Sequence, residues 1–371
     1  FFQAEDGIRA SVASRGLGDV YKRQEVWWLV MAANTHPEVT SNADTEVGSY
    51  FVANYPPFSV WTENAVGALA RPALESISAK IPLGLYLHIP FCRKRCHFCY
   101  FRVYTDKNAN EIQSYLDTLA REWELYGEQR AIADRPLDFI YFGGGTPSFL
   151  SVRQLRGLVD RLSAVRSWST ASEITFECEP GTLTEPKLAA IREMGVTRLS
   201  LGVEHFDDQV LEQNGRAHRS AEIFRAYDYA RSISFPQINI DLISGMLEET
   251  EDNWRACVAK TIEMAPDSVT IYQMEIPYNT TIYQRMKEEG KLTAPVADWE
   301  TKRRWTDYAF NQLQDAGYTV SSAYTAVKDK AQTRFIYRDE LWAGADLLSL
   351  GVASFGHIGG CLLYTSPSPR D

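Results

Sequence analysis

The most constraining feature of this sequence is a regular alternation of β-type runs and helical segments between residues 83 and 290. Short runs of Ile, Leu, Val and aromatic residues predict strands at 83–89, 138–142, 173–179, 197–203, 237–244 and 268–274. Apolar residues at three- and four-residue steps predict helices over 110–130, 184–194, 208–231 and 250–264, and Ser151 with Gln154 predicts a capping box that opens another. Six such repeats favour an α/β fold, a partial parallel barrel of the (β/α)6 type, with its chemistry at the C-terminal ends of the strands.

The segments outside residues 83–290 do not share this alternation. Residues 1–24 and 361–371 resemble translated sequencing-adapter sequence, so we set residues 1–30 and 361–371 aside as artefact or disorder. Residues 31–82, rich in Asn, Thr and Pro, predict an irregular N-terminal extension, and residues 291–360 a smaller, truncated accessory region. Within it, the charge run Lys302 to Arg304 is typical of a solvated helix face.

Composition excludes several classes of protein. The net charge of −10 argues against binding to nucleic acid or to an anionic membrane. No apolar run approaches the ~18 residues of a membrane span. Six cysteines in 371 residues are too few for a disulfide-built scaffold. We therefore expect a globular protein with neither nucleic acid nor membrane as partner. No secretion signal is visible once the adapter-like segment is set aside, so we expect a cytoplasmic location.

Three cysteines lie close together directly after the first predicted strand, as Cys92-x3-Cys96-x2-Cys99. Thiolates at this spacing can share one metal centre, and the three basic residues between the first two would lower the thiol pKa values. Two interpretations remain open. One is zinc in a Cys3His site, with His88 or His97 as the fourth ligand. The other is a 4Fe–4S cluster that has one iron left open for another ligand.

Other polar positions gather where strands end. Three glycines, Gly143 to Gly145, precede Thr146 and Pro147, and a backbone without side chains allows close approach to a ligand. Glu177 is near the end of its strand, whereas Glu179 fits an alternating solvent-facing carboxylate. Asp241 interrupts an apolar strand, where a carboxylate is costly to bury unless it is paired, and we expect Arg216 as its partner.

These motifs together resemble the radical S-adenosylmethionine (radical SAM) superfamily and, within it, the oxygen-independent coproporphyrinogen III oxidase-like branch. The resemblance runs from about residue 83 to residue 360, through the segments 86–92, 143–147, 177–180, 198–203, 214–216 and 239–243. It implies that Cys92, Cys96 and Cys99 hold a 4Fe–4S cluster. It also implies that S-adenosylmethionine is contacted by Tyr86, Phe98, Gly144, Gly145, Thr146 and Glu177, and that a second molecule of it is contacted by Glu204, Arg216 and Asp241.

The resemblance also implies a reaction. Such an enzyme reductively cleaves S-adenosylmethionine to a 5′-deoxyadenosyl radical, with flavodoxin or ferredoxin as electron donor. In the oxidase the radical starts the oxidative decarboxylation of propionate side chains in porphyrin biosynthesis, so the implied substrate is a small molecule, a tetrapyrrole. Two alternatives remain within the branch: a methyl-transferring or ring-forming radical enzyme, and a heme-binding chaperone.

Several positions depart from the oxidase pattern. Phe101 stands where the oxidase has a further cysteine, and Glu204 replaces a glutamine that contacts the second S-adenosylmethionine. Met246-Leu247 replaces the usual Leu-Pro. The segment Tyr337 to Trp342 lacks the His and Asn of the chaperone motif, which leaves His357 as an alternative heme ligand. These departures do not change the resemblance to the superfamily. They leave open which substrate the protein uses.

Overall fold

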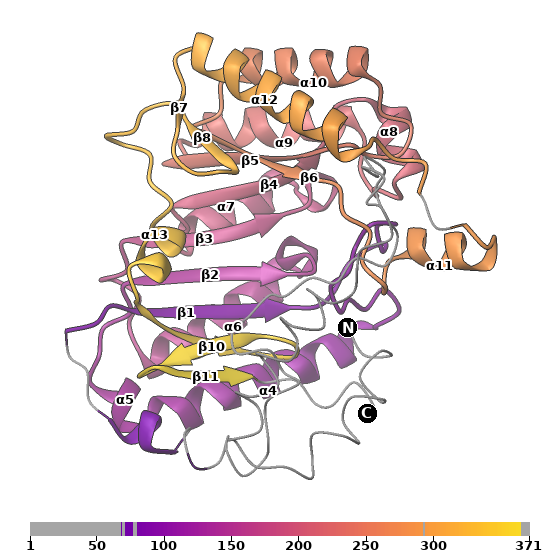
Figure 1. Ribbon diagram of the computed structural model, residues 1–371. Helices are drawn as coiled ribbons and strands as arrows, with labels where there is room; N and C mark the ends of the chain where they lie inside the picture. Colours follow the sequence, from indigo (N-terminus) through magenta and orange to yellow (C-terminus); the bar gives the residue numbers. More distant parts are fainter. Residues whose placement is uncertain (1–67, 69–70, 77–79, 292–293, 365–371) are drawn as a thin grey trace, which may run out of the picture.

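The computed structural model describes residues 68, 71–76, 80–291 and 294–364 (Figure 1). The predicted terminal segment 1–30, residues 365–371 of the predicted segment 361–371, and most of the 31–82 extension lie outside the described residues, whereas residues 361–364 form a strand. Within the described part, one sheet has the strand order β11-β10-β9-β1-β2-β3-β4-β5-β6-β8-β7. The strands are β1 (Leu83–Ile89), β2 (Phe139–Gly144), β3 (Glu173–Cys178), β4 (Arg198–Glu204), β5 (Gln237–Ser244), β6 (Ser268–Gln273), β7 (Thr319–Val320), β8 (Thr325–Val327), β9 (Asp346–Leu350), β10 (Phe355–Ile358) and β11 (Cys361–Tyr364).

The strands β1 to β6 are parallel and adjacent in chain order, as the alternation predicts. The edge strands β11 and β7 do not pair with each other, so the barrel is partial. Because every β-strand from β1 to β6 runs the same way, their carboxyl ends meet at one edge of the sheet. The predicted fold class is confirmed.

Helices connect these strands, and side-chain caps begin several of them. Asn108, Ser151 and Thr250 each form a capping box with the residue three positions later, which satisfies backbone donors of the first turn. The larger helices are α4 (Ala109–Gly127), α6 (Val152–Val165), α7 (Glu185–Glu193), α9 (Ser220–Ser232), α10 (Glu251–Met264) and α12 (Trp299–Asp315). Shorter ones are α5 (Arg130–Ala133), η2 (Pro147–Phe149), η3 (Pro180–Thr182), α8 (Asp208–Gln213), α11 (Thr281–Glu288) and α13 (Ile336–Trp342).

The two faces of the sheet differ in polarity. Leu85 and Ile140 on one face join the apolar core with helix residues such as Leu116 and Leu155. The other face carries polar side chains at alternate positions. Tyr86, Tyr141 and Thr175 are paired across β1, β2 and β3, and Ser200 is paired with Asn239 across β4 and β5. A sheet with helices on one face and polar groups on the other resembles a barrel wall whose interior binds a ligand.

The C-terminal region extends the same sheet at both edges. β9 pairs in parallel with β1, and β8 pairs antiparallel with β6. The helix α13 lies against the polar face, where its backbone N–H groups at Ile336 and Tyr337 donate to the carboxylate of Glu173. Lys302 is not on a solvated face as expected, because α12 buries it and its Nζ donates to the carbonyl of Met274 at 2.7 Å. No helix in the described ranges is both long and apolar enough to span a membrane.

Candidate active site

The cysteine loop follows β1 at the carboxyl edge of the sheet. Cys92 is buried, and its Sγ accepts a hydrogen bond from Thr146 Oγ1 at 3.2 Å. Cys96 Sγ accepts one from Arg216 Nη1, also at 3.2 Å. The N–H of Cys99 donates to the carbonyl of Cys96, so the last two cysteines share a tight turn. The loop therefore presents three thiols, two of them next to hydrogen-bond donors.

Each nearby histidine uses one ring nitrogen in another contact, and the Nε2 of His88 is buried without a hydrogen-bond partner among the described residues. His97 Nδ1 faces the carbonyl of Gln213 at 2.9 Å, and His88 Nδ1 faces the hydroxyl of Tyr86 at 3.2 Å. In the described residues, no three His, Cys, Asp or Glu side chains converge closely enough to hold a metal ion. Burial raises the pKa of Cys92 to about 11 and of Cys99 to about 12, so metal binding must displace protons from these thiols.

The glycine loop after β2 lies against the cysteine loop. Gly144 has a φ of +111°, and a Cβ added to it would be 2.8 Å from the ring of His88. A Cβ added to Gly145 would be 3.0 Å from both Cys92 Sγ and the carbonyl oxygen of Ile89. Glycine is favoured at Gly144 by its positive φ and the nearby His88 ring, and at Gly145 because the backbone passes close to Cys92. With Thr146 bonded to Cys92, this loop forms one wall of the candidate cluster site.

Glu177 lies on β3, where its side chain is on the polar face and contacts β2. It accepts hydrogen bonds from the hydroxyl of Tyr141 at 2.6 Å and from the N–H of Gly144 at 3.1 Å. Burial raises the pKa of Glu177 to about 7. The two hydrogen bonds lower the pKa, but their effect is smaller than that of burial. The ring of Tyr86 stacks on that of Tyr141, with centroids 5.8 Å apart. The structure thus brings Tyr86 and Glu177 together beside Gly144.

Phe98 lies between the second and third cysteines and is partly buried. It packs against Ile243, Met246 and Met274, at the ends of β5 and β6, and against Ile276. This contact joins the cysteine loop to the far side of the partial barrel. A role as a wall of the cofactor site stays a prediction.

The expected pair between Asp241 and Arg216 does not form. Asp241 accepts hydrogen bonds from Ser200 Oγ at 2.7 Å and from Asn239 Nδ2 at 2.9 Å, its neighbours on the same sheet face. Arg216 instead donates to the carbonyl of Gly202 at 2.6 Å and lies 3.5 Å from Glu204 Oε1. The reason is strand register, which places neutral hydrogen-bond donors beside Asp241. The turn that carries Arg216 contacts other groups.

Glu204 ends β4 at an irregularity in the sheet. The pairing of β4 with β5 shifts between Gly202 and Glu204, and Glu204 has a φ of +65°, which is unusual for a residue with a side chain. Such backbone strain is typical of functional sites. Burial raises the pKa of Glu204 to about 7, although Arg216 lowers it. Near neutral pH the side chain can therefore change charge.

We expect Glu204→Gln to remove a pH dependence of folding. The folded pKa of about 7 lies above the unfolded value of about 4.3, so the stabilisation from Glu204 is present below pH ~4.3 and is lost as the pH rises through about 7. The variant should therefore gain about 3 kcal/mol over the parent between pH 4.5 and pH 8. Anaerobic urea unfolding of the iron-free proteins at both pH values measures this gain. A stability difference that is equal at the two pH values would show that Glu204 does not titrate there.

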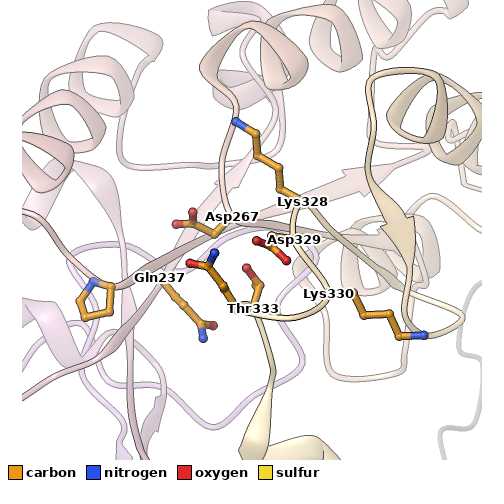
Figure 2. A pocket seen from close by; sticks show the side chains of 8 residues that line it. Gln237, Asp267, Lys328, Asp329, Lys330 and Thr333 are labelled. Atoms are coloured by element: carbon orange, nitrogen blue, oxygen red, sulfur yellow. The ribbon is translucent and has the colours of Figure 1, made fainter.

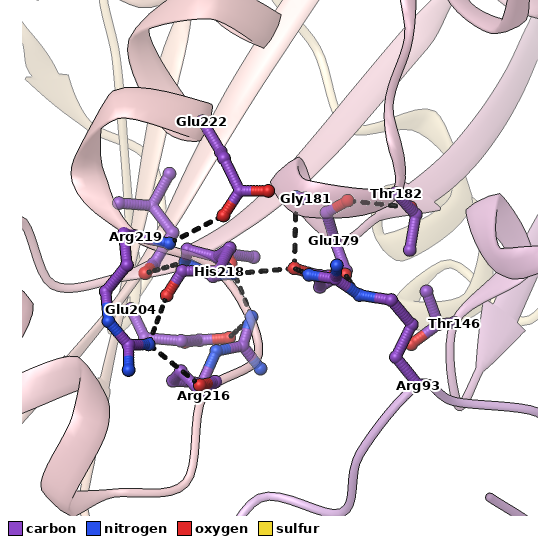
Figure 3. A network of polar contacts seen from close by, with 12 residues as sticks. Arg93, Thr146, Glu179, Gly181, Thr182, Glu204, Arg216, His218, Arg219 and Glu222 are labelled. Atoms are coloured by element: carbon purple, nitrogen blue, oxygen red, sulfur yellow. Dashed lines mark hydrogen bonds and ion pairs between the residues drawn. The ribbon is translucent and has the colours of Figure 1, made fainter.

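Glu179 and His218 were not identified from the sequence. Glu179 does not face solvent as expected: its side chain is 10 % exposed, and its carboxylate contacts Arg93 of the cysteine loop and His218 (Figure 3). The Glu-Cys-Glu alternation places Glu179 on the polar side together with Glu177. The signal that could have indicated the role of Glu179 is Arg93, the arginine directly after the first cysteine, because it needs a carboxylate partner.

A separate cavity of about 660 Å³ lies at the opposite edge of the sheet (Figure 2). Its lining includes Gln237 at the start of β5, Asp267 just before β6, and Lys328 and Thr333 from the segment after β8. None of the predicted cofactor residues lines it. The candidate active site is therefore not this cavity but the carboxyl edge of the sheet.

Comparison with known proteins agrees with this placement. Residues 86–260 match the sequence model of the radical SAM superfamily. This chain contains a radical SAM domain. The match begins at Tyr86 in β1 and ends in α10, so it includes the cysteine loop, the glycine loop and the β4 and β5 residues described above.

Individual relatives come from one branch of radical SAM proteins. The heme chaperone HemW of Bacillus subtilis is 29 % identical over 280 residues, which are 74 % of this chain and 71 % of that protein. The oxygen-independent coproporphyrinogen III oxidase of Synechocystis is 29 % identical over 240 residues, 64 % of this chain and 50 % of that protein. The chain thus spans from half to about seven-tenths of the length of these relatives.

A solved structure supports the same fold. Coproporphyrinogen III oxidase (HemN) from Escherichia coli, described as a radical SAM enzyme, superposes with a TM-score of 0.73 at 25 % identity, covering 84 % of this chain and 73 % of that one. The cofactors of a radical SAM domain are a 4Fe–4S cluster and S-adenosylmethionine. The predicted cofactors are therefore confirmed, and the alternative of a zinc site is not. The three thiols of the cysteine loop and the glycine-lined space beside Cys92 fit the cluster. The assignments of individual residues stay predictions.

Proposed function

We propose that this protein is a radical SAM oxidoreductase of the coproporphyrinogen III oxidase type, which removes carbon dioxide from acidic side chains of a tetrapyrrole. The observation that carries the proposal is the arrangement of three thiols and a glycine loop at the carboxyl edge of a radical SAM domain. An electron donor such as flavodoxin or ferredoxin in the cytoplasm would supply the reducing electron. The support from relatives is divided between the oxidase and the heme chaperone.

Each group of residues would have a separate task. Cys92, Cys96 and Cys99 would hold the cluster, and Arg216 next to Cys96 would offset part of its negative charge. The backbone at Gly144 and Gly145 would receive S-adenosylmethionine, with Glu177 and Tyr86 beside it. When bound, these cofactors supply hydrogen-atom abstraction from an unactivated C–H bond. The protein's contribution is to orient the substrate and to exclude water from the partial barrel.

A second molecule of S-adenosylmethionine stays part of the proposal. Glu204, Arg216 and Asp241 lie on adjacent elements of the polar face, although Arg216 contacts Cys96 rather than Asp241. An ionised Glu204 would attract a sulfonium cation. The pKa of about 7 leaves this charge available at neutral pH.

Arg198, at the start of β4, supports an acidic substrate. It is 2 % exposed, its guanidinium lies 4.0 Å from the ring centroid of Phe335, and its Nε and Nη1 have no hydrogen-bond partner among the described residues. Buried N–H groups without an acceptor are costly. Nε and Nη1 point to different sides of the guanidinium, so a carboxylate oxygen of a substrate could accept from one of them. Porphyrinogen propionates are carboxylates of this kind.

The test is anaerobic turnover of the reconstituted protein with coproporphyrinogen III, followed by mass spectrometry. We expect loss of carbon dioxide from propionate and formation of 5′-deoxyadenosine. Cleavage of S-adenosylmethionine without any change of the porphyrinogen would keep the radical SAM activity and reject this substrate.

For Arg198→Met we expect weaker substrate binding but unchanged cleavage of S-adenosylmethionine in the absence of substrate. Loss of a hydrogen bond to a charged group costs roughly 1.5–3 kcal/mol, so the KM for coproporphyrinogen III should rise about 10- to 100-fold. Arg198→Lys, which keeps the charge without the fork, should show a smaller rise. An unchanged KM in the methionine variant would remove Arg198 from the substrate site.

Heme binding is the second candidate, because curated relatives include heme chaperones. The segment that would carry their motif is α13 here, and it lacks both His and Asn. His357 on β10 is exposed and is the remaining candidate ligand. A hemin titration of the parent and of His357→Ala separates the two functions. A stoichiometric complex that His357→Ala abolishes would favour the chaperone.

A further inference from the structure

One carboxylate connects the cysteine loop to the barrel wall. Glu179 follows the last residue of β3, and both of its oxygens accept hydrogen bonds from Arg93, at 3.2 Å from Nε and 3.1 Å from Nη2 (Figure 3). The N–H of Gly181 donates to the same carboxylate at 3.0 Å. Arg93 is the residue directly after Cys92. A bidentate arginine–carboxylate pair gives orientation as well as energy.

A second connection runs from Glu179 to the turn that carries Arg216. His218 Nδ1 lies 3.0 Å from Glu179 Oε1, and its Nε2 lies 3.2 Å from the carbonyl oxygen of Val203. The His218 side chain is fully buried. Two residues earlier, Arg216 donates to Cys96 Sγ. The contacts therefore form a closed path from Cys92 through Arg93, Glu179 and the His218 turn back to Cys96.

The pair lies close to the backbone of η3. A Cβ on Gly181 would be 2.1 Å from Arg93 Nη2 and 2.9 Å from Glu179 Oε1. A side chain at position 181 would therefore displace the guanidinium from the carboxylate. Burial would raise the pKa of Glu179, but His218, Arg216 and Arg93 outweigh it and hold the pKa at about 2. The carboxylate is therefore ionised and can partner the arginine at any physiological pH.

We propose that Glu179 is a positioning residue, which holds both the Cys92 and the Cys96 side of the cysteine loop in the geometry that the cluster requires. It acts through Arg93 on one side and through His218 and Arg216 on the other. The proposal rests on the proposed function, because it concerns the cluster that the three cysteines would hold. Glu179 itself touches no thiol.

The experiment compares Glu179→Gln, Arg93→Met and the double variant after anaerobic reconstitution. Loss of a group that supports a metal ligand typically costs about 10- to 100-fold in metal affinity. We expect each single variant to lose iron to a chelator about 10- to 100-fold faster, with an altered EPR spectrum of the reduced cluster. The double variant should be no worse than the more severe single variant, because both act through one pair. Arg93→Lys should recover part of the loss.

Glu193→Gln is the matched control, because it removes an exposed carboxylate that pairs with Arg156 at 2.7 Å far from the loop. It should leave iron retention and the EPR spectrum unchanged. Arg93 is one-third exposed, so Arg93→Met tests the contact even if Glu179→Gln folds poorly. Folded variants that match the parent in chelation rate and EPR spectrum would overturn the proposal. A parent protein that holds no cluster would instead overturn the proposed function.

Discussion

Replacing any one of Cys92, Cys96 and Cys99 by alanine is expected to abolish both the cluster and the cleavage of S-adenosylmethionine. The parent should bind about four irons per chain after anaerobic reconstitution, the content of one 4Fe–4S cluster. Each variant removes one of the three thiols of the predicted ligand set, and Nδ1 of each nearby histidine is engaged elsewhere. The loss should therefore exceed the roughly 10- to 100-fold effect of changing a supporting group.

Cys257→Ala provides the control for this experiment. Cys257 is a buried thiol on α10, in the apolar core, and its replacement should leave the iron content unchanged. Iron and 5′-deoxyadenosine are measured in the parent and in all four variants. Full iron content in a Cys96→Ala or Cys99→Ala protein, or stoichiometric zinc in the parent, would contradict the ligand assignment.

Gly145→Val is expected to cause the second-largest effect, a loss of affinity for S-adenosylmethionine, because it places a branched side chain between the two loops of the site. Its Cβ would be 3.0 Å from Cys92 Sγ, from the carbonyl oxygen of Ile89 and from the carbonyl carbon of Pro90. Two of these atoms belong to the backbone and cannot turn away. Overpacking of this kind costs about 1–3 kcal/mol, so we expect a lower melting temperature and at least about a tenfold loss of affinity for S-adenosylmethionine.

Gly157→Val adds the same side chain on the exposed side of α6, where no atom lies within 4 Å of the added Cβ. It should retain full affinity for S-adenosylmethionine. Equilibrium binding to the two reconstituted variants makes the comparison. If Gly145→Val binds as tightly as the parent, the glycine loop is not part of the cofactor site.

The strands were predictable where apolar runs have clear ends. The predicted ranges 83–89 and 237–244 coincide with β1 and β5, since a proline follows the first run and a glycine the second. The prediction for β2 stopped at Phe142 because glycines disfavour strands. The structure continues β2 to Gly144, since pairing with His88 and Ile89 outweighs that local preference.

The polar contacts of the site were less predictable. Asp241 was recognised as a carboxylate that needs a partner, but its donors, Ser200 and Asn239, follow from strand register. The role assigned to Glu179 was wrong because alternation along one strand does not reveal what another loop brings to it. Lys302 was misplaced for the same reason, since the charge run says nothing about the packing of α12 over Met274.

The sequence by itself determined the parallel α/β fold, and it placed three cysteines and a glycine loop directly after neighbouring strands, because these features depend on local periodicity and on the spacing of a few residue types. Tertiary structure alone decided which charged groups meet: Arg216 at Cys96, Glu179 at Arg93 and His218, and Arg198 beneath Phe335. It also decided that strands after residue 291 join both edges of the sheet. The physical reason is that ion pairs and edge pairing join residues far apart in the chain, and their geometry exists only after the strands have taken their register.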